Sequence, residues 1–511
     1  FGEAQAVFEK LRASGNHSEA VTYGLALVLE NEGYLSIVGG GNGRGTAEEM
    51  RQAADLLRPL VYAPHPSRRV RQLYADTLNV FSHAQPMQKA VAMCDEARKI
   101  LVGLGALDLS NLDATSSYAD TADSEARHLL SLGRVAEAQK LEQQVYELAD
   151  KILVKRPGDL HALADRSWAA ELLGQLAVRQ HDDAAIADYA NKTVQAGADE
   201  VRFNPSDLGA WQRWSVGFSQ VAGLQFERGE IAQAIATQRS LLALEQDPRR
   251  PSSLGPILFV QWLPLVQWQA QIGDSAAAAQ SVRSFARDIS EVVAQSAQDS
   301  PRRELMANDE QAVRGSMELA EGAPQAALAD VTAEVARVDA VRVPAGDVIS
   351  SYIRDNILRS NLGTAAIAAL RLGRYRQAET LARRWLAIPS NSTSDADPQI
   401  KNSRAQSVLA HSMAMQGRND EAQKALQPAL AYYEGEQKAG AHGTTLRHDY
   451  AYALYVSAIA SSADAPGRAQ RKAALDAAAK LIAGASAEAQ KLADMRQVSG
   501  LIASADASSS K

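Results

Sequence analysis

The stretch Leu372-Gly373-Arg374-Tyr375-Arg376-Gln377-Ala378 places a glycine five residues before an alanine, between two segments with helical periodicity. Glycine adopts the left-handed conformation that ends many helices because it has no Cβ atom to clash. The alanine lies one turn into the following helix, where a small side chain lets two helices approach closely. The pair therefore predicts the turn of a helical hairpin. Its clear copies are Gly15/Ala20, Gly133/Ala138, Gly229/Ala234, Gly273/Ala278, Gly322/Ala327, Gly373/Ala378 and Gly417/Ala422.

A second small residue lies seven positions before most of these glycines. Small residues on both sides of a glycine turn are expected where two antiparallel helices pack closely. Degenerate copies at Gln85/Ala90 and Gln180/Ala185 divide the longer intervals, so the spacing indicates a repeat of about 48 residues. The small residues are Ala126, Ala222, Gly315, Ala366 and Ala410, and the two exceptions are Phe8 and Val266.

These segments resemble the tetratricopeptide repeat. The centre of that repeat is similar to the stretch ending at Ala378, to Arg228-Gly229-Glu230-Ile231-Ala232-Gln233-Ala234 and to Gln416-Gly417-Arg418-Asn419-Asp420-Glu421-Ala422, and its terminal proline is similar to Pro248 and Pro389. The resemblance implies an all-α, right-handed α-solenoid of antiparallel helical hairpins. The standard unit has about 34 residues, so these repeats are enlarged. We expect the array over residues 1–460, C-terminal capping helices over 461–503 and a flexible tail over 504–511.

Composition excludes several classes of protein. The 53 Lys and Arg against 60 Asp and Glu give 511 residues a net charge of −7, so we expect no nucleic-acid partner. The most apolar segment, residues 254–268, is interrupted by Gln261, Pro264 and Gln267, so we expect no membrane insertion. The single cysteine, Cys94, excludes an internal disulfide. We favour a cytoplasmic location, and a periplasmic or other extracytoplasmic one stays open.

The sequence carries no organised catalytic or metal motif. The glycine-rich stretch 39–45 precedes a helix but lacks the Lys-Ser/Thr of a P-loop, so we interpret it as an inter-helix loop rather than an anion site. The nine histidines lack metal-binding spacing, and Asp395-Ala396-Asp397 reads as a solvated loop. Cys94 falls on an apolar helix face, as a buried thiol does. We therefore predict no catalytic residue, no metal and no cofactor: the protein is not an enzyme.

Four of the six tryptophans lie within the middle of the chain: Trp211, Trp214, Trp262 and Trp268. Trp211, Trp214 and Phe218 share one helical face, a spacing typical of core packing. The alternative is an aromatic pocket that faces a ligand, because an exposed aromatic cluster is costly unless it is covered.

The resemblance also implies a function, which is a non-catalytic scaffold for a protein or peptide partner. If the register of the family holds, the second and ninth positions of the first helices line the concave face. The alternative is a small-ligand sensor that controls an attached effector domain, and a third candidate is an enzyme with a dispersed site. Because the chain begins at Phe1 without a methionine, we expect it to be the helical-repeat portion of a larger multidomain regulatory protein; its oligomeric state stays open. The predicted partner-binding residues are Arg127, Gln220, Gln267, Asn356, Arg404 and His411.

Overall fold

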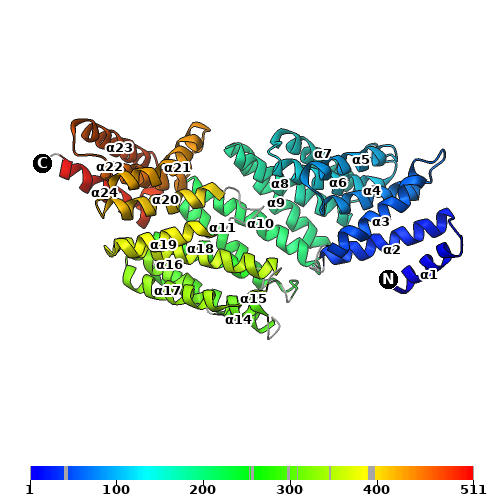
Figure 1. Cartoon of the computed structure of the whole chain (residues 1–511), viewed down its shortest axis with the longest axis horizontal. Coiled ribbons are helices and arrows are strands. Elements are labelled where there is room, and N and C mark those ends of the chain that lie inside the picture. Colours follow the sequence, from blue (N-terminus) through cyan, green and yellow to red (C-terminus); the bar gives the residue numbers. More distant parts are fainter. Residues whose placement is uncertain are drawn as a thin grey trace. The chain divides into compact units, whose positions relative to one another are not determined.

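The computed structural model describes residues 2–38, 44–251, 254, 258–295, 300–307, 309–344, 347–388 and 398–509. Within these ranges the regular elements are helices, and no strand occurs, which confirms the all-α, tetratricopeptide-like solenoid (Figure 1). Two compact units divide the chain. The N-terminal unit comprises residues 1–177 and 188–204, and the C-terminal unit comprises residues 178–187 and 205–511.

The helices follow one another as hairpins. The first part of the chain contains α1 (Gly2–Ala13), α2 (Glu19–Val38), α3 (Arg44–Val61), α4 (Arg68–Ser82), α5 (Met87–Val102), α6 (Leu112–Ser131), α7 (Val135–Lys155), α8 (Leu160–Arg179) and α9 (Asp183–Phe203). The C-terminal unit continues with α10 (Leu208–Glu227), α11 (Ile231–Leu242), α13 (Trp262–Gln271), α14 (Ser275–Gln295), α15 (Pro301–Met306), α16 (Asp309–Ala320), α17 (Pro324–Ala340), α18 (Val348–Arg371) and α19 (Tyr375–Ala387). It ends with α20 (Pro398–Ala414), α21 (Asn419–Lys438), α22 (Thr444–Ile459), α23 (Ala465–Ala483) and α24 (Ala493–Ser509), and short 3₁₀ turns η1 (Ala243–Gln246), η3 (Phe259–Gln261) and η4 (Ala489–Lys491) lie between helices.

The glycine turns form as the sequence predicts. All seven clear copies have positive φ, from 71° at Gly373 to 91° at Gly15. At Gly373 the backbone N–H donates to the carbonyl of Leu370 (3.0 Å), and the N–H of Arg374 donates to Ala369 (2.9 Å), so the end of the helix is capped. At the degenerate copy Gln180/Ala185, the left-handed residue is His181 (φ 54°), one position later than the lost glycine.

The small residues bring the helices of a hairpin close together. A Cβ atom on Gly315 would lie 2.6 Å from Val331 Cγ1 and 3.3 Å from the carbonyl oxygen of Ala327, which confirms the expected approach. The alanine after the turn is fully buried in six of the seven copies, and Ala20 is exposed. Ala378 packs in an apolar cluster with Ala365 and Ala369 of the preceding helix.

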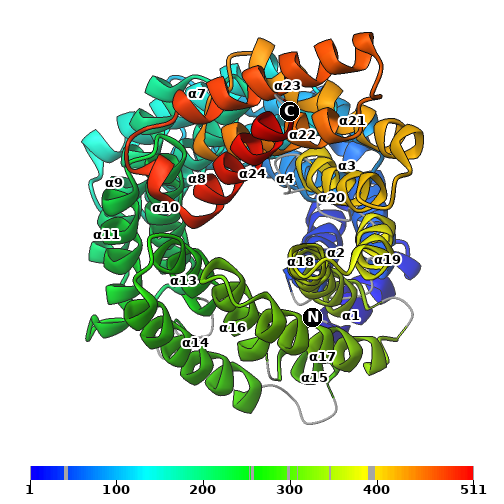
Figure 2. The same cartoon turned by 90° about the vertical axis from the view of Figure 1, so that its left-hand side faces the viewer.

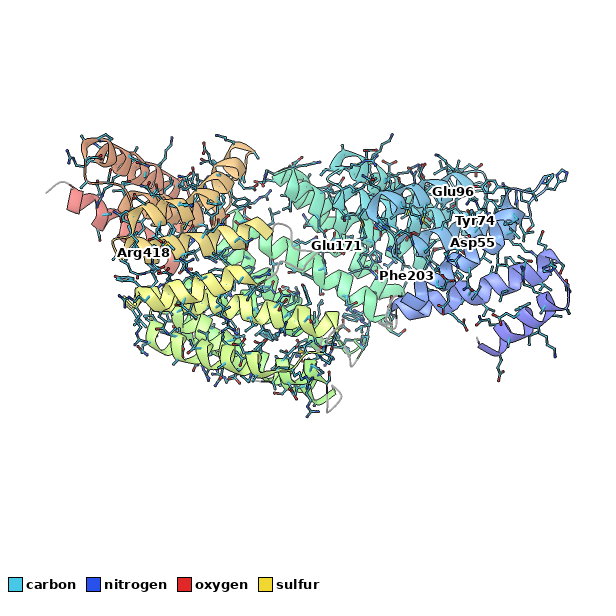
Figure 3. All side chains as sticks on the ribbon, in the orientation of Figure 1. Asp55, Tyr74, Glu96, Glu171, Phe203 and Arg418 are labelled. Atoms are coloured by element: carbon cyan, nitrogen blue, oxygen red, sulfur yellow. The ribbon has the colours of Figure 1, made fainter. Side chains whose placement is uncertain are left out.

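The N-terminal unit has a continuous core from α2 to α8. The hydroxyl of Tyr74 on α4 donates to Glu96 on α5 (3.2 Å), and both residues are labelled in Figure 3. The hydroxyl of Tyr62 donates to the same carboxylate (2.6 Å). Cys94 is buried, and burial raises the pKa of its thiol to about 11. It is therefore a structural thiol in the protonated form.

The contacts divide the chain into two units, and the expected domain bounds stay a prediction. The contact boundary falls near residues 177–205, a range that includes the degenerate copy Gln180/Ala185. The predicted capping segment contains α23 and α24, and α24 continues to Ser509, so helix extends over most of the residues expected to form a flexible tail. The capping role of these helices stays a prediction.

The C-terminal unit is a ring. Figure 2 shows α10 to α20 following one another around it, with α22 to α24 completing the circle. Hydrogen bonds between residues more than 200 positions apart join its beginning to its end. A solenoid whose first and last hairpins touch encloses space, and this space forms the candidate site.

Candidate functional site

The C-terminal unit contains a half-open cavity of about 920 Å³. Most of its lining comes from the first helices of successive hairpins, namely α10, α13, α16, α18, α20 and α22, together with the last helix, α24. First helices face inward because the second helix of each hairpin packs on the outside of the ring. The cavity wall is mainly apolar, with a small number of charged and hydroxyl-bearing side chains.

Glu227 at the end of α10 closes the ring against the start of α22. Its carboxylate accepts hydrogen bonds from the backbone N–H of Thr445 (3.0 Å) and from Thr445 Oγ1 (2.5 Å). Thr444 Oγ1 donates to the backbone carbonyl of Glu227 (3.0 Å). Burial raises the pKa of Glu227, and the bonds from Thr445 oppose this rise.

A second contact closes the ring beside the Gly229 turn. Ser486 Oγ donates to the carbonyl oxygen of Gly229 (2.8 Å), and Glu488 accepts from the N–H of Ala232 (3.0 Å). Only glycine fits here, because a Cβ atom on Gly229 would lie 2.2 Å from Ser486 Oγ.

Asp494 on α24 holds together three helices that line the cavity. Its carboxylate accepts from Gln271 Nε2 (2.6 Å) and from Arg371 (3.0 Å), while Arg371 also donates to the carbonyl of Leu319 (2.6 Å). Burial raises the pKa of Asp494, but His448, Arg371 and Arg404 outweigh burial, so the pKa lies below its ordinary value. Asp494 is therefore an anion with both oxygens occupied.

Arg404 on α20 is the second cation of the cavity. Its Nε lies 3.3 Å from Asp449 Oδ1, an oxygen that also lies 2.7 Å from His448 Nδ1. The attraction of Asp449 raises the pKa of Arg404. Burial raises the pKa of Asp449, but Arg404 and His448 bring it below its usual value. The side chain of Arg404 is 39% exposed, and this surface faces the cavity that it lines.

His411 lies two helical turns after Arg404 on the same face of α20. Its Nδ1 is 2.7 Å from the Tyr452 hydroxyl, and its ring packs against Tyr455 with centroids 5.4 Å apart. Burial lowers the pKa of His411 to about 4, and burial also raises the pKa of Tyr452, so both groups are neutral at pH 7. The pair forms a polar patch in an otherwise apolar wall.

Trp268 is the one predicted tryptophan that lines the cavity. It stacks on Phe226 with ring centroids 5.0 Å apart and an interplanar angle of 12°. Trp211 is fully buried and donates from Nε1 to Pro205 (2.9 Å), and it packs on Trp214. Trp262 donates to Asp288 (2.6 Å). The set therefore divides between core positions and one cavity wall, and the four rings do not form a shared pocket.

The predicted partner-binding residues also divide. Gln267, Arg404 and His411 line the cavity, whereas Gln220 and Asn356 do not. Arg127 belongs to the N-terminal unit, where it pairs with Asp123 (2.8 Å) and lies over the ring of Trp168. Whether any of them contacts a partner stays a prediction.

Sequence reasoning missed the residues that line the cavity from distant helices, namely Glu227, Arg371, His448, Tyr452 and Asp494, and it missed Asp449, which pairs with Arg404. Part of the signal was present, because His448, Tyr452 and Tyr455 follow one another at helical spacing on a first helix. No local pattern connects them with Asp494, since that pairing depends on the closure of the ring.

Two sequence interpretations lie outside the described residues, namely most of the glycine-rich stretch 39–45 and the acidic loop 395–397. Within the described ranges, no group of three or more His, Cys, Asp and Glu side chains could hold a metal ion. Among the same residues, no helix has both the length and the apolar character needed to cross a membrane.

Comparison with known proteins adds a limited similarity. No family model matches the chain, and no curated protein matches it. A tetratricopeptide repeat protein from Parabacteroides merdae is similar at 14% identity over 66% of this chain and 98% of its own, with a TM-score of 0.32. The Cut9–Hcn1 hetero-tetramer of the APC/C is similar at 13% identity over 92% of this chain and 93% of its own, with a TM-score of 0.30. A monomeric IFIT1 mutant with m7Gppp-AAAA is similar at 13% identity over 96% of this chain and 90% of its own, with a TM-score of 0.36. At these values the similarity carries no functional argument.

Proposed function

We propose that this protein acts by binding rather than by catalysis: it is a helical-repeat scaffold whose C-terminal unit holds a ligand inside its cavity. The observation that carries the proposal is the ring closed around about 920 Å³. Cavities of roughly 300–1,000 Å³ with apolar walls and a few convergent polar groups are typical of sites for small organic ligands.

The state of the ionisable groups in the cavity supports binding over catalysis. General acid–base catalysis uses a group that exchanges protons near the working pH. Asp494 stays ionised and is bonded to Gln271 and Arg371, and His411 stays neutral beside Tyr452. These side chains are suited to fixed hydrogen bonds.

The aromatic lining of the site favours the small-ligand sensor within this scaffold. A peptide-binding solenoid is expected to present a broad groove, and a sensor is expected to present an enclosed aromatic pocket. The stacked Phe226 and Trp268 and the cluster of His411, Tyr452 and Tyr455 fit the second description. A protein partner would then bind the outer surface of the array. This chain would be part of a larger regulatory protein that responds when a ligand occupies the ring.

An uncharged fluorescent probe tests whether the cavity binds ligands. N-phenyl-1-naphthylamine gains fluorescence in apolar sites, and we expect saturable binding to the whole chain. Thr364→Trp should weaken this binding at least tenfold, because Thr364 lines the cavity and the larger ring would fill it. Thr380→Trp is the matched control, since Thr380 is exposed on the second helix of the same hairpin. Equal binding to both variants would place the probe elsewhere and reject the cavity as the site.

A further inference from the structure

The hydrogen-bonding capacity of the cavity is unevenly used. Its two carboxylates are occupied, Glu227 by Thr445 and Asp494 by Gln271 and Arg371. Arg371 is occupied by Asp494 and by the carbonyl of Leu319. Among the described wall residues, the remaining arginine, Arg404, is engaged on one edge only.

That edge is Nε, which faces Asp449 at 3.3 Å. Among the described residues, no hydrogen bond reaches the two terminal amino groups of Arg404. A guanidinium group presents its donors in a planar fork that matches the two oxygens of a carboxylate. Asp449 fixes the Nε side of this fork. The two terminal amino groups are therefore held in position without a protein acceptor.

A second donor lies on the same face of α20. His411 and Tyr452 share one hydrogen bond of 2.7 Å. Both are neutral, so the pair has one imidazole N–H and one phenol O–H, and their mutual bond uses one of them. In either tautomer the other donor is left over, and both residues line the cavity.

The rest of the cavity wall is apolar and fits the apolar part of a ligand. Phe226 and Trp268 form a stacked pair, and Ile367, Val408, Met415 and Leu501 contribute aliphatic surface. The volume of about 920 Å³ fits a single small organic molecule.

We infer that the cavity binds a small organic acid, whose carboxylate pairs with the terminal amino groups of Arg404 and whose aromatic or aliphatic body lies against Phe226 and Trp268. This inference rests on the proposed function and specifies the chemical class of its ligand. The carboxylate completes the hydrogen bonds of Arg404, and the leftover donor of the His411–Tyr452 pair serves a further polar group of the ligand.

The test compares 4-phenylbutyrate with its uncharged isostere 4-phenylbutyramide, both measured by calorimetry and by displacement of N-phenyl-1-naphthylamine from the whole chain. We expect the acid to bind about tenfold more tightly than the amide, as charge-assisted hydrogen bonds give. Arg404→Gln should remove this preference, so that the acid binds no more tightly than the amide. Arg376→Gln, an exposed arginine on α19, should behave like the wild type.

Arg404→Lys is the control for unfolding, because lysine keeps the positive charge beside Asp449 but lacks the planar guanidinium group. It should retain the melting temperature and lose most of the preference for the acid. If the probe binds and the acid and amide compete equally, the organic-acid inference is wrong while the cavity function stands. If neither the probe nor the acid binds, both fail. A short peptide with a free C-terminal carboxylate that binds where phenylbutyrate does not would also overturn the inference, in favour of a peptide ligand.

Discussion

Substitution of Gly229 by alanine tests the closure of the C-terminal ring. Gly229 has a φ of 76°, and a Cβ atom there would lie 2.2 Å from Ser486 Oγ and 2.8 Å from Ser486 Cβ. Gly417 has nearly the same φ, 77°, but a Cβ atom there would meet nothing within 4 Å. The two positions therefore share the backbone strain of a left-handed alanine and differ in the contact with the end of the chain.

The magnitudes follow from these contacts. Left-handed strain costs about 1–2 kcal/mol, which is the whole effect expected for Gly417→Ala. Overpacking adds about 1–3 kcal/mol, so Gly229→Ala should cost about 2–5 kcal/mol. Ser486→Gly removes the side chain that the new methyl group meets. The double variant Gly229→Ala/Ser486→Gly should therefore be more stable than the sum of the two single changes predicts.

Urea unfolding followed by tryptophan fluorescence measures these differences. Trp168 lies in the N-terminal unit, whereas the other five of the six tryptophans lie in the C-terminal unit, so the signal reports mainly on the ring. Equal destabilisation by Gly229→Ala and Gly417→Ala, with no coupling to Ser486, would show that the turn and the end of the chain do not touch.

Three further predictions concern packing and pH. Ala378→Trp and Ala422→Trp should destabilise the protein by about 1–3 kcal/mol or more because both alanines are fully buried, and an unchanged melting midpoint would refute the hairpin register. Trp211→Ala should cost about 3–5 kcal/mol in urea unfolding because the ring is fully buried, whereas a loss below about 1 kcal/mol would contradict a core role. Burial raises the pKa of Asp309 to about 7, and the charge of Glu334 adds to the rise. Between the ordinary pKa of an aspartate and this value, Asp309 is protonated in the folded protein and ionised in the unfolded chain. Stability from this group falls as pH rises from about 4 to about 7, and Asp309→Asn should flatten the pH dependence of the melting temperature in that window; an identical slope in both proteins would refute the assignment.

The hairpins could be predicted because each depends on residues close together in the sequence. Gly373 ends one helix and Ala378 packs against that helix from the next one, so a seven-residue motif is enough to predict the hairpin turn. The same register brought Gln267, Arg404 and His411 to the cavity wall. Gln220 and Asn356, chosen as looser matches to that register, do not reach it.

The ring could not be predicted because its closing contacts carry no local pattern. Glu227 and Thr445 are 218 residues apart, and Gln271 and Asp494 are 223 apart. Small changes in the angle between successive hairpins add up along a solenoid and decide whether its ends meet. Tryptophan spacing had a similar limit. A shared helical face indicates that Trp211 and Trp214 pack together, but it does not show which way Trp268 faces.

Closure and ligand binding should be coupled, because the same side chains serve both. Glu227 and Asp494 line the cavity and also join the beginning of the ring to its end. A ligand that binds only the closed ring stabilises it, by about 2.7 kcal/mol at a concentration one hundred times its Kd. A change that opens the ring must in turn weaken the apparent affinity for the ligand, in proportion to the fraction of the protein that stays closed.

Gly229→Ala is a direct way to measure this coupling, since Gly229 itself does not line the cavity. We expect the variant to bind N-phenyl-1-naphthylamine more weakly than Gly417→Ala does, and Ser486→Gly to restore part of the affinity. Saturating probe should in turn raise the melting temperature of the wild type more than that of Gly229→Ala. If probe affinity is identical in all four proteins while their stabilities differ, the cavity forms without closure of the ring. Ligand binding would then not be coupled to closure, and a bound ligand could not change the surface that a partner contacts.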